Sequence, residues 1–469
     1  MDGHAYSPAI LLKMLDAAAH VKSFDVAAHL LQRTAEFTIS GRHLNRIVEE
    51  IGGEMRDARD QRTEDYVHHR RTPLSQPAPR KVALGVDGGR LNTRQTGHGG
   101  GVHEPGWRED KVGCLQVLEG PLFTMDPHPQ PPQCFLDKDH VKQMVKDFQQ
   151  QKGLRCYDEP EAPLPSPAAP QNQEQSQTGT DLPPPAAAAP LGIPTVPGST
   201  AAVQPAVVPR ALAALQAQLA APPVSSAMLA TPAWPPQRLA RTCVASLANS
   251  HEFAKLLAAE AYARGFFAAD QRAFLGDGLA YNWTIQQHWF PDFVPILDFV
   301  HPLSYLYATA GALSDHEEQR WSLYVRWLGA SWQGRVQEVV AELRQGQGRL
   351  QEQLGPSKGK LAANDPREVL RKAINYLENN ASRMDYPRYR RLGLPVTSSA
   401  VESLIKEVNY RVKGSEKFWN DPEGAEAILQ VRAAALSEDD RLAAHVHNRP
   451  GHAYRRRTSV RSGEKKPAA

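Results

Sequence analysis

The sequence predicts a mixed α/β protein, and three features of the 469-residue chain support this class. Apolar runs typical of buried strands occur at 82–87 and 112–118, and again at 273–283 and 293–303. Runs with apolar residues at helical spacing lie between and after them. Strands that alternate with helices predict a sheet covered by helices, and the length allows two or three domains.

The first predicted domain, residues 1–60, is helical. Ser40 is a candidate N-cap that separates two helical runs, and the second run carries Arg42 and Arg46 on its polar side. A short helix, a tight turn and a second helix with outward basic residues fit a helix-turn-helix DNA reader. An ordinary helical hairpin fits the same pattern. Residues 61–79, rich in charge and then in proline, are predicted to be a linker.

The first part of the core is predicted at residues 80–157. An apolar strand leads into Asp87, and we expect a sharp turn at Gly88-Gly89. The second strand, at 112–118, lies so close along the chain that the two are expected to form a hairpin. A short helix is predicted at 139–150.

An abrupt change of composition follows the first part of the core. Proline, alanine, glutamine and serine dominate residues 158–236, which cannot bury enough apolar surface to offset the ordering entropy, so a disordered insert is predicted. We expect the second part of the core at 237–302, a helical insertion at 303–390, the last core helices at 391–440 and a basic tail at 441–469.

The cellular compartment is inferred from cysteine usage and from segments that the sequence lacks. The four cysteines are widely spaced and form no CxxC pair, which is typical of reduced thiols. There is no signal-peptide pattern, and no apolar run approaches the roughly 20 residues that cross a bilayer. These features predict a cytoplasmic protein with no membrane partner.

Two aspartates share one local pattern: Asp87 and Asp277 each follow an apolar run and a glycine or valine, and each precedes glycine. Ligands of α/β sheets bind beyond the carboxyl ends of the strands, where loops form a crevice. Both side chains are therefore candidates for a shared site. The alternative is that each aspartate only opens a turn, because Asp-Gly is a common turn dipeptide.

A third carboxylate, Glu402, lies near the start of a strongly amphipathic helix. It falls opposite the buried stripe, in line with Lys406, Asn409 and Lys413, whose side chains suit phosphate oxygens. The alternative role for Glu402 is a capping box with Ser399. Spacing alone does not separate these two roles.

Together the three carboxylates form the ligand set of a hard divalent cation. Mg²⁺ (or Mn²⁺) takes oxygen ligands from a few carboxylates and completes its shell with water and substrate phosphates. Two such ions about 4 Å apart can hold the attacking and leaving oxygens of an in-line displacement at phosphorus. The set Asp87, Asp277 and Glu402 therefore predicts two-metal nuclease or strand-transfer chemistry.

Six blocks of sequence, taken in order, carry a resemblance to a known family. They are VALGVDGGRLNTR, GWREDKVGCLQVLEG, FLGDGLAYNW, ILDFVHPLSYL, RMDYPRYRRLGLPVTSSAVES and KGSEKFWNDPEGAEAILQVRAAAL. In these blocks the chain resembles bacterial insertion-sequence transposases of the Mutator-related DDE type, in the ISKra-type group. The resemblance covers most of the chain outside 158–236. Relatives have Gly-Ser-Gly before Val-Glu-Ser, where this chain has Thr397-Ser398-Ser399-Ala400.

The resemblance implies a ribonuclease-H-like core whose catalytic DDE triad corresponds to Asp87, Asp277 and Glu402. Asp298 and His301 match the family's Asp-x-x-His element, which would bring His301 near the scissile phosphate. The helical region before the glutamate corresponds to an insertion domain. The N-terminal helices would bind terminal inverted repeats, which favours the helix-turn-helix interpretation.

The function implied by the resemblance is a Mg²⁺-dependent transposase that cleaves element ends and joins them to target DNA. Its partners would be double-stranded DNA and further copies of the chain, at the bacterial nucleoid. A non-catalytic DNA-binding relative is the main alternative. A phosphohydrolase of small esters would fit the strand-end aspartates but would leave the N-terminal helices unexplained.

Overall fold

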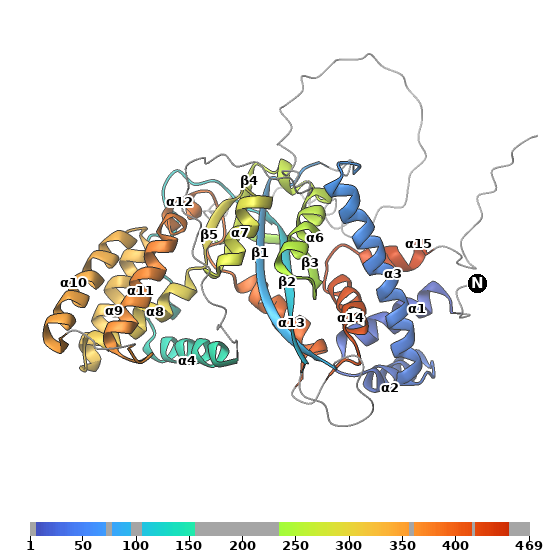
Figure 1. The fold of residues 1–469 in the computed structure, drawn as a ribbon. Coiled ribbons are helices and arrows are strands. Elements are labelled where there is room, and N and C mark those ends of the chain that lie inside the picture. The colour runs from blue at the N-terminus through green and yellow to red at the C-terminus, as the bar shows by residue number, and fades with distance from the viewer. Residues whose placement is uncertain are drawn as a thin grey trace, which may run out of the picture. The chain divides into compact units, whose positions relative to one another are not determined.

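The computed structural model describes residues 6–71, 77–94, 106–154, 234–355, 361–414 and 418–449, which belong to one unit of the chain. Figure 1 labels its elements. In chain order they are α1 (Pro8–His20), α2 (Phe24–Ala35), α3 (Gly41–Val67), β1 (Lys81–Thr93), β2 (Gly106–Glu119), η1 (Gln133–Leu136), α4 (Lys138–Leu154), β3 (Gln237–Ser246), α6 (Ser250–Ala263), η2 (Phe266–Ala268), β4 (Gln271–Gly276), α7 (Ala280–Trp289), β5 (Val294–Leu297), α8 (Val300–Leu313), α9 (Glu317–Trp332), α10 (Val336–Leu354), α11 (Pro366–Asn380), η3 (Ala381–Arg383), α12 (Tyr386–Arg391), α13 (Ser399–Val412), α14 (Pro422–Ala435) and α15 (Arg441–Asn448).

The strands form one open sheet in the order β3-β2-β1-β4-β5 (Figure 1). β2 pairs antiparallel with both β1 and β3, whereas β1, β4 and β5 pair in parallel. β2 therefore runs opposite to the other four strands. The predicted α/β class is confirmed, and so is the hairpin of the first two strands.

β1 differs from the prediction at its glycines. We predicted a sharp turn at Gly88-Gly89, but β1 pairs with β2 without a break from Lys81 to Thr93. The physical reason is tertiary packing, because α13 crosses this strand closely. A methyl group on Gly85 would lie 3.2 Å from the Cγ1 atom of Val401 in α13. Glycine thus serves close approach here and not a change of chain direction.

Helices cover both faces of the sheet, and alternate residues of β1 face two different hydrophobic clusters. Val82, Leu84 and Val86 belong to the first cluster, with side chains from α6, α7 and the helices that follow β5. Leu91 belongs to the second cluster, with side chains from α1, α2, α3, α13 and α14.

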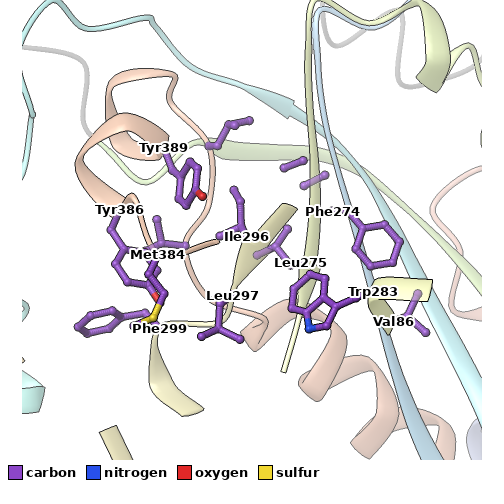
Figure 2. Packing of buried hydrophobic residues seen from close by; sticks show 14 of the residues in the cluster. Val86, Phe274, Leu275, Trp283, Ile296, Leu297, Phe299, Met384, Tyr386 and Tyr389 are labelled. Carbon is purple, nitrogen blue, oxygen red and sulfur yellow. The ribbon is translucent and has the colours of Figure 1, made fainter. Parts of the chain in front are cut away.

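The predicted helical region 303–390 is confirmed as α8 to α12, with α8, α9, α10 and α11 packed against one another (Figure 1). Figure 2 shows how the first cluster joins this region to β5: Ile296 and Leu297 lie near Met384, Tyr386 and Tyr389. The apolar runs at 273–283 and 293–303 are strands only in their first halves. Their second halves lead into α7 and α8, because β4 ends at Gly276 and β5 at Leu297.

The N-terminal region is helical as predicted, and the predicted N-cap is confirmed: Ser40 Oγ accepts a hydrogen bond from His43 N at 3.2 Å. The predicted linker 61–79 needs correction at its start, because α3 continues to Val67. Tyr66 explains the extension, since its buried ring packs against the ring of Tyr262 at a centroid distance of 5.2 Å.

Two buried arginines attach the end of α1 to the core helices. Arg411 of α13 donates a hydrogen bond to Ala18 O at 2.5 Å, and Arg432 of α14 donates to Ala19 O at 2.9 Å. The last carbonyls of a helix lack partners within the helix and carry partial negative charge. The guanidinium groups supply both the missing hydrogen-bond donors and a compensating positive charge. They thereby fix α1 to α13 and α14, with which the N-terminal helices share one hydrophobic cluster.

The predicted basic tail 441–469 also needs correction at its start. Residues Arg441–Asn448 form α15, and the buried Arg449 pairs with Glu50 at 2.9 Å and with Glu54 at 2.6 Å in α3. Charge in this segment is thus partnered with α3. The predicted insert 158–236 lies outside the described residues except for 234–236, and so does the tail beyond 449.

Two further observations concern the compartment prediction. Within the described ranges, no helix combines the length and the apolar character that a bilayer crossing requires. Cys114, Cys134 and Cys243 are free thiols, as predicted, and Cys156 lies outside the described residues.

Candidate metal centre

Three aspartates fall in one row across adjacent parallel strands. Gly85 of β1 pairs with Leu275 of β4, so Asp87, two residues further on, falls in the row of Asp277. The pairing of β4 with β5 continues this row to Asp298, whose N–H donates to the Gly276 carbonyl at 2.8 Å. Neighbouring strands lie about 4.8 Å apart. The three acids therefore lie toward the same end of the parallel strands.

Asp87 is buried within β1 and is not at its end. Its Oδ1 atom accepts a hydrogen bond from Gly88 N at 2.7 Å, and the residue is 7% exposed. Asp87 lies two residues after Gly85 in β1, so both residues point to the face of the sheet that α13 covers. The side chain thus lies on the same face of the sheet as the helix that carries Glu402.

Asp277 follows β4 directly, in a loop that the helical insertion holds in place. Its Oδ1 atom accepts hydrogen bonds from Leu279 N at 3.1 Å and from Asn282 Nδ2 at 3.0 Å. The hydroxyl of Tyr376 in α11 donates to the Asp277 carbonyl at 3.0 Å. Gly278 has φ 97° under this ring, a conformation that favours glycine. The insertion thus shapes the loop that presents Asp277.

Asp298, His301 and Glu402 form a compact group that could hold a metal ion. Each offers one ligand atom, and these atoms lie within 4.8 Å of one another. His301 Nε2 lies 3.8 Å from Asp298 Oδ2 and 3.9 Å from Glu402 Oε1. Asp298 comes from the loop after β5, His301 from the first turn of α8 and Glu402 from the first turn of α13.

Ser398 connects the two carboxylates of this group. Its hydroxyl contacts both Asp298 Oδ2 and Glu402 Oε1, the second at 2.9 Å. The capping box between Ser399 and Glu402 is not formed, because α13 has Ser398 at its N-cap and Ser399 Oγ instead lies 3.2 Å from Thr397 Oγ1. Of the two roles proposed for Glu402, the geometry supports the one in the site.

The electrostatics of the group favour a cation. Asp298 is fully buried, and burial raises its pKa to about 6, although His301 acts to lower it and Glu402 raises it further. Two close carboxylates with no arginine or lysine paired to them in the described contacts leave net negative charge. Carboxylates suit Mg²⁺ and Mn²⁺, and the imidazole adds affinity for Mn²⁺ or Zn²⁺. The donor set thus fits a divalent ion.

The aromatic ring of Phe148 in α4 closes one side of the group. It lies 4.9 Å from the His301 ring, measured between centroids. Phe148 is half-buried, and His301 keeps 19% of its side chain exposed. The imidazole is therefore reachable from solvent while its ring plane is held by a neighbour.

The structure divides the predicted catalytic set. It brings Glu402 and His301 together with Asp298, which the resemblance had suggested as an accessory position. Within the described residues, Asp87 and Asp277 are not part of the group whose ligand atoms lie within 4.8 Å. They lie in the same row as Asp298, so their role as ligands of the same centre stays a prediction.

The predicted DNA-contacting residues have different surroundings. Lys406 and Lys413 are exposed along α13, and Arg42 and Arg46 are exposed on the first turns of α3. Asn409 is half-buried, and its amide oxygen is buried without a hydrogen-bond partner. The polar side of α13 is thus interrupted by one residue that points inward.

Sequence reasoning missed two residues of this region, Ser398 and Asp110. Ser398 precedes Glu402 by one helical turn, which is a usable signal for contact at a helix start. Asp110 lies in the charged run 108–111 of β2 and is fully buried beside Gly89. The charged neighbours on both sides gave no signal that this acid is buried.

No protein-family model matches the chain, and no curated protein shows significant similarity to it.

Proposed function

We propose that this chain is a DNA transposase of the DDE type, which binds the ends of a mobile insertion element and catalyses metal-dependent cleavage and strand transfer. One observation carries the proposal. Asp87, Asp277 and Asp298 fall in a single row of the parallel strands, and Glu402 and His301 approach the last of them. This arrangement supports a set of acids that converge on a phosphate through divalent ions.

The fold supports a ribonuclease-H-like core for this enzyme. The mixed sheet has the order β3-β2-β1-β4-β5, with β2 opposite to its neighbours and helices on both faces. Such a sheet is compatible with the core that the resemblance implies. The helical insertion between β5 and α13 is compatible with the insertion domain of related transposases.

The residues of the site would divide the work as follows. Bound Mg²⁺ or Mn²⁺, in a pair, would neutralise phosphate charge and activate an oxygen nucleophile. Asp87, Asp277 and Glu402 would hold the ions, with Asp298 as a neighbouring carboxylate. Ser398 orients the Glu402 carboxylate, and His301 is placed to hold or release a proton beside a scissile phosphate.

The exposed basic residues support double-stranded DNA as the substrate. Lys406 and Lys413 follow Glu402 along α13, so they suit phosphates next to the reacting one. Arg42 and Arg46 lie at the start of α3. With α2 before it, α3 would be the recognition helix that contacts terminal-repeat DNA. We expect further copies of the chain to assemble on the DNA, at the bacterial nucleoid.

The test is a cleavage assay with full-length protein and DNA that carries the repeats flanking the gene. Asp277→Asn and Glu402→Gln should each abolish Mn²⁺- or Mg²⁺-dependent cleavage and leave DNA binding in a gel-shift assay nearly unchanged. The matched control is Asp270→Asn, because Asp270 is exposed at the opposite end of β4 and pairs only with the exposed Arg80. The control should cleave like wild type.

Two outcomes would overturn the proposal in different ways. Wild-type activity in Asp277→Asn and Glu402→Gln would remove both residues from the site. Tight, repeat-specific binding by the wild type with no cleavage in either metal ion would favour the alternative, a DNA-binding relative that has lost catalysis.

A further inference from the structure

A second group of polar atoms is buried on the face of β1 that α13 covers. Asp110 of β2 pairs with Gly89 of β1 and is fully buried. Among the described residues, no other residue donates a hydrogen bond to either oxygen of its carboxylate, and the buried amide oxygen of Asn409 in α13 has no partner. Three acceptors thus lie at one place with no donor from another side chain.

Gly89 brings these three oxygens to one small volume. A methyl group on Gly89 would lie 2.8 Å from each carboxylate oxygen of Asp110 and 2.9 Å from Asn409 Oδ1. Any residue with a Cβ atom at this position would fill that volume, so only glycine leaves it open. Asn409 thus turns its oxygen toward the carboxylate, although an amide could offer its N–H groups to the same acceptor.

An arrangement of acceptors alone is unfavourable in a protein interior, because buried polar groups normally find partners. Burial raises the pKa of Asp110 to about 7, although its own backbone N–H and the charge of Lys413 act to lower it, and the charges of Glu109 and Asp87 raise it further. The environment therefore repels the carboxylate charge. A positive ion among the oxygens would compensate for the missing donors.

We propose that Asp110 and Asn409 bind a divalent cation of the Mg²⁺, Mn²⁺ or Ca²⁺ class over Gly89, at a site separate from Asp298, His301 and Glu402. The donors are all oxygen, which selects hard cations over Zn²⁺ or Cu²⁺. The negative charge of Asp87 on the same strand face favours a divalent ion over a monovalent one. This ion does not depend on DNA or on the proposed transposase activity.

Lys413 is the alternative occupant. Its charge acts on Asp110, but its side chain is exposed and forms no ion pair with that carboxylate. A cation from solution and the Lys413 ammonium would compete for the same oxygens. Removal of the lysine therefore distinguishes the two.

The experiment counts Mn²⁺ bound to metal-free full-length protein, from the electron paramagnetic resonance signal of free Mn²⁺. The background variant is Asp277→Asn/Glu402→Gln, which removes ligands of the catalytic centre. We expect it to retain one Mn²⁺, and we expect addition of Asp110→Asn to weaken that site at least tenfold. Glu119→Gln is the matched control, because this acid is exposed at the far end of the same strand, β2. It should leave binding unchanged.

Equal Mn²⁺ affinity with and without Asp110→Asn would overturn the proposal. If Asp110→Asn does not fold, Asn409→Leu tests the same site, since leucine has a similar size and no oxygen; it too should weaken binding at least tenfold. Lys413→Ala should leave the Mn²⁺ affinity equal or tighter. A background variant that binds no Mn²⁺ while Lys413→Ala lowers stability as much as Asp110→Asn would assign the oxygens to the lysine.

Discussion

Two buried carboxylates in this molecule show how neighbours decide what an acid does. Glu260 of α6 is buried, and burial alone would raise its pKa, yet Arg441, Arg264 and Arg62 lower it to about 2. Arg441 Nη2 lies 2.7 Å from Glu260 Oε1, and Arg264 also pairs with this carboxylate. Asp298 is fully buried, and burial raises its pKa to about 6, because no arginine among the described residues opposes the effect and its neighbours are a hydroxyl, an imidazole and a second carboxylate.

The difference in basic partners indicates which buried carboxylate would bind a metal ion from solution. At Glu260 the arginines come from α3, from the C-cap of α6 and from the first residue of α15, so the charges join three parts of the fold. At Asp298 the described contacts contain no arginine or lysine, so among these residues only the imidazole of His301 can offer the carboxylate a positive charge. A buried acid without a basic partner is therefore a better indicator of a metal site than burial or a shifted pKa by itself.

The largest effect that tests this comparison is on stability without metal ions. Glu260→Gln leaves the buried guanidinium groups of Arg441 and Arg264 without their full charge partner, and we expect a loss of about 3 kcal/mol in the free energy of unfolding. Asp298→Asn removes no cationic partner and should cost less than half as much. Urea unfolding of both variants in chelator, followed by circular dichroism, measures the difference.

A loss for Asp298→Asn as large as that for Glu260→Gln would contradict the comparison. It would mean that the Asp298 charge is already compensated within the fold. Glu252→Gln is a suitable control, because its partner pair with Lys255 in α6 is partly exposed and contributes little.

Acid should weaken the Glu260 region selectively. Because its pKa is lowered from 4.5 to about 2 in the folded state, Glu260 adds stability above pH 4.5, and this contribution is lost as the pH falls toward 2. The difference in unfolding free energy between wild type and Glu260→Gln should therefore shrink from pH 5 to pH 3. Urea unfolding at a series of pH values tests this, and a difference that stays constant over that interval would refute the lowered pKa.

The smallest effect concerns the hydroxyl that connects the two carboxylates of the metal centre. Ser398→Gly removes the hydroxyl that can donate to Asp298 or Glu402 and should cost about 1 kcal/mol in stability. The same change should weaken Mn²⁺ binding about tenfold or more, as expected for a group that orients a ligand. Ser399→Gly is the matched control, because Ser399 contacts only Thr397 there. Equal Mn²⁺ affinities in the two variants would show that Ser398 does not orient Glu402.

Periodicity was sufficient to predict most elements of the fold. Ser40 as N-cap, the hairpin of β1 and β2, and the helix that carries Glu402 all follow from local signals. The errors have a common cause, because they occur where distant segments change a local preference. Gly88-Gly89 is a turn signal by itself, but α13 packs across β1 and makes small residues necessary within the strand.

The charged segments gave the same kind of error. The start of the linker and the start of the tail are rich in charge, which predicts solvent exposure. In the structure Arg449 of the predicted tail pairs with Glu50 and Glu54 of α3, so charge in the tail is partnered by the N-terminal helices. A single sequence does not contain the distances that decide such pairs.

The candidate site could be predicted only in part. The residue patterns predicted Asp87, Asp277 and Glu402, and the resemblance added Asp298 and His301; the structure groups the last three. The alternative capping role of Glu402 could not be excluded before the position of Ser398 was known. Asp110 was missed because its possible role depends on two tertiary contacts. It pairs with Gly89 on the neighbouring strand, and its carboxylate lies near Asn409 of α13.

The attachment of α1 to α13 gives the metal centre a mechanical dependence on the N-terminus. α13 carries Glu402 in its first turn and Arg411 in its last, and as a helix of 14 residues it spans about 21 Å. One end of this rod is pinned by the carbonyls of α1, while the other presents a metal ligand. A shift of the N-terminal helices would therefore tilt α13 and move the Glu402 carboxylate at the other end of the helix.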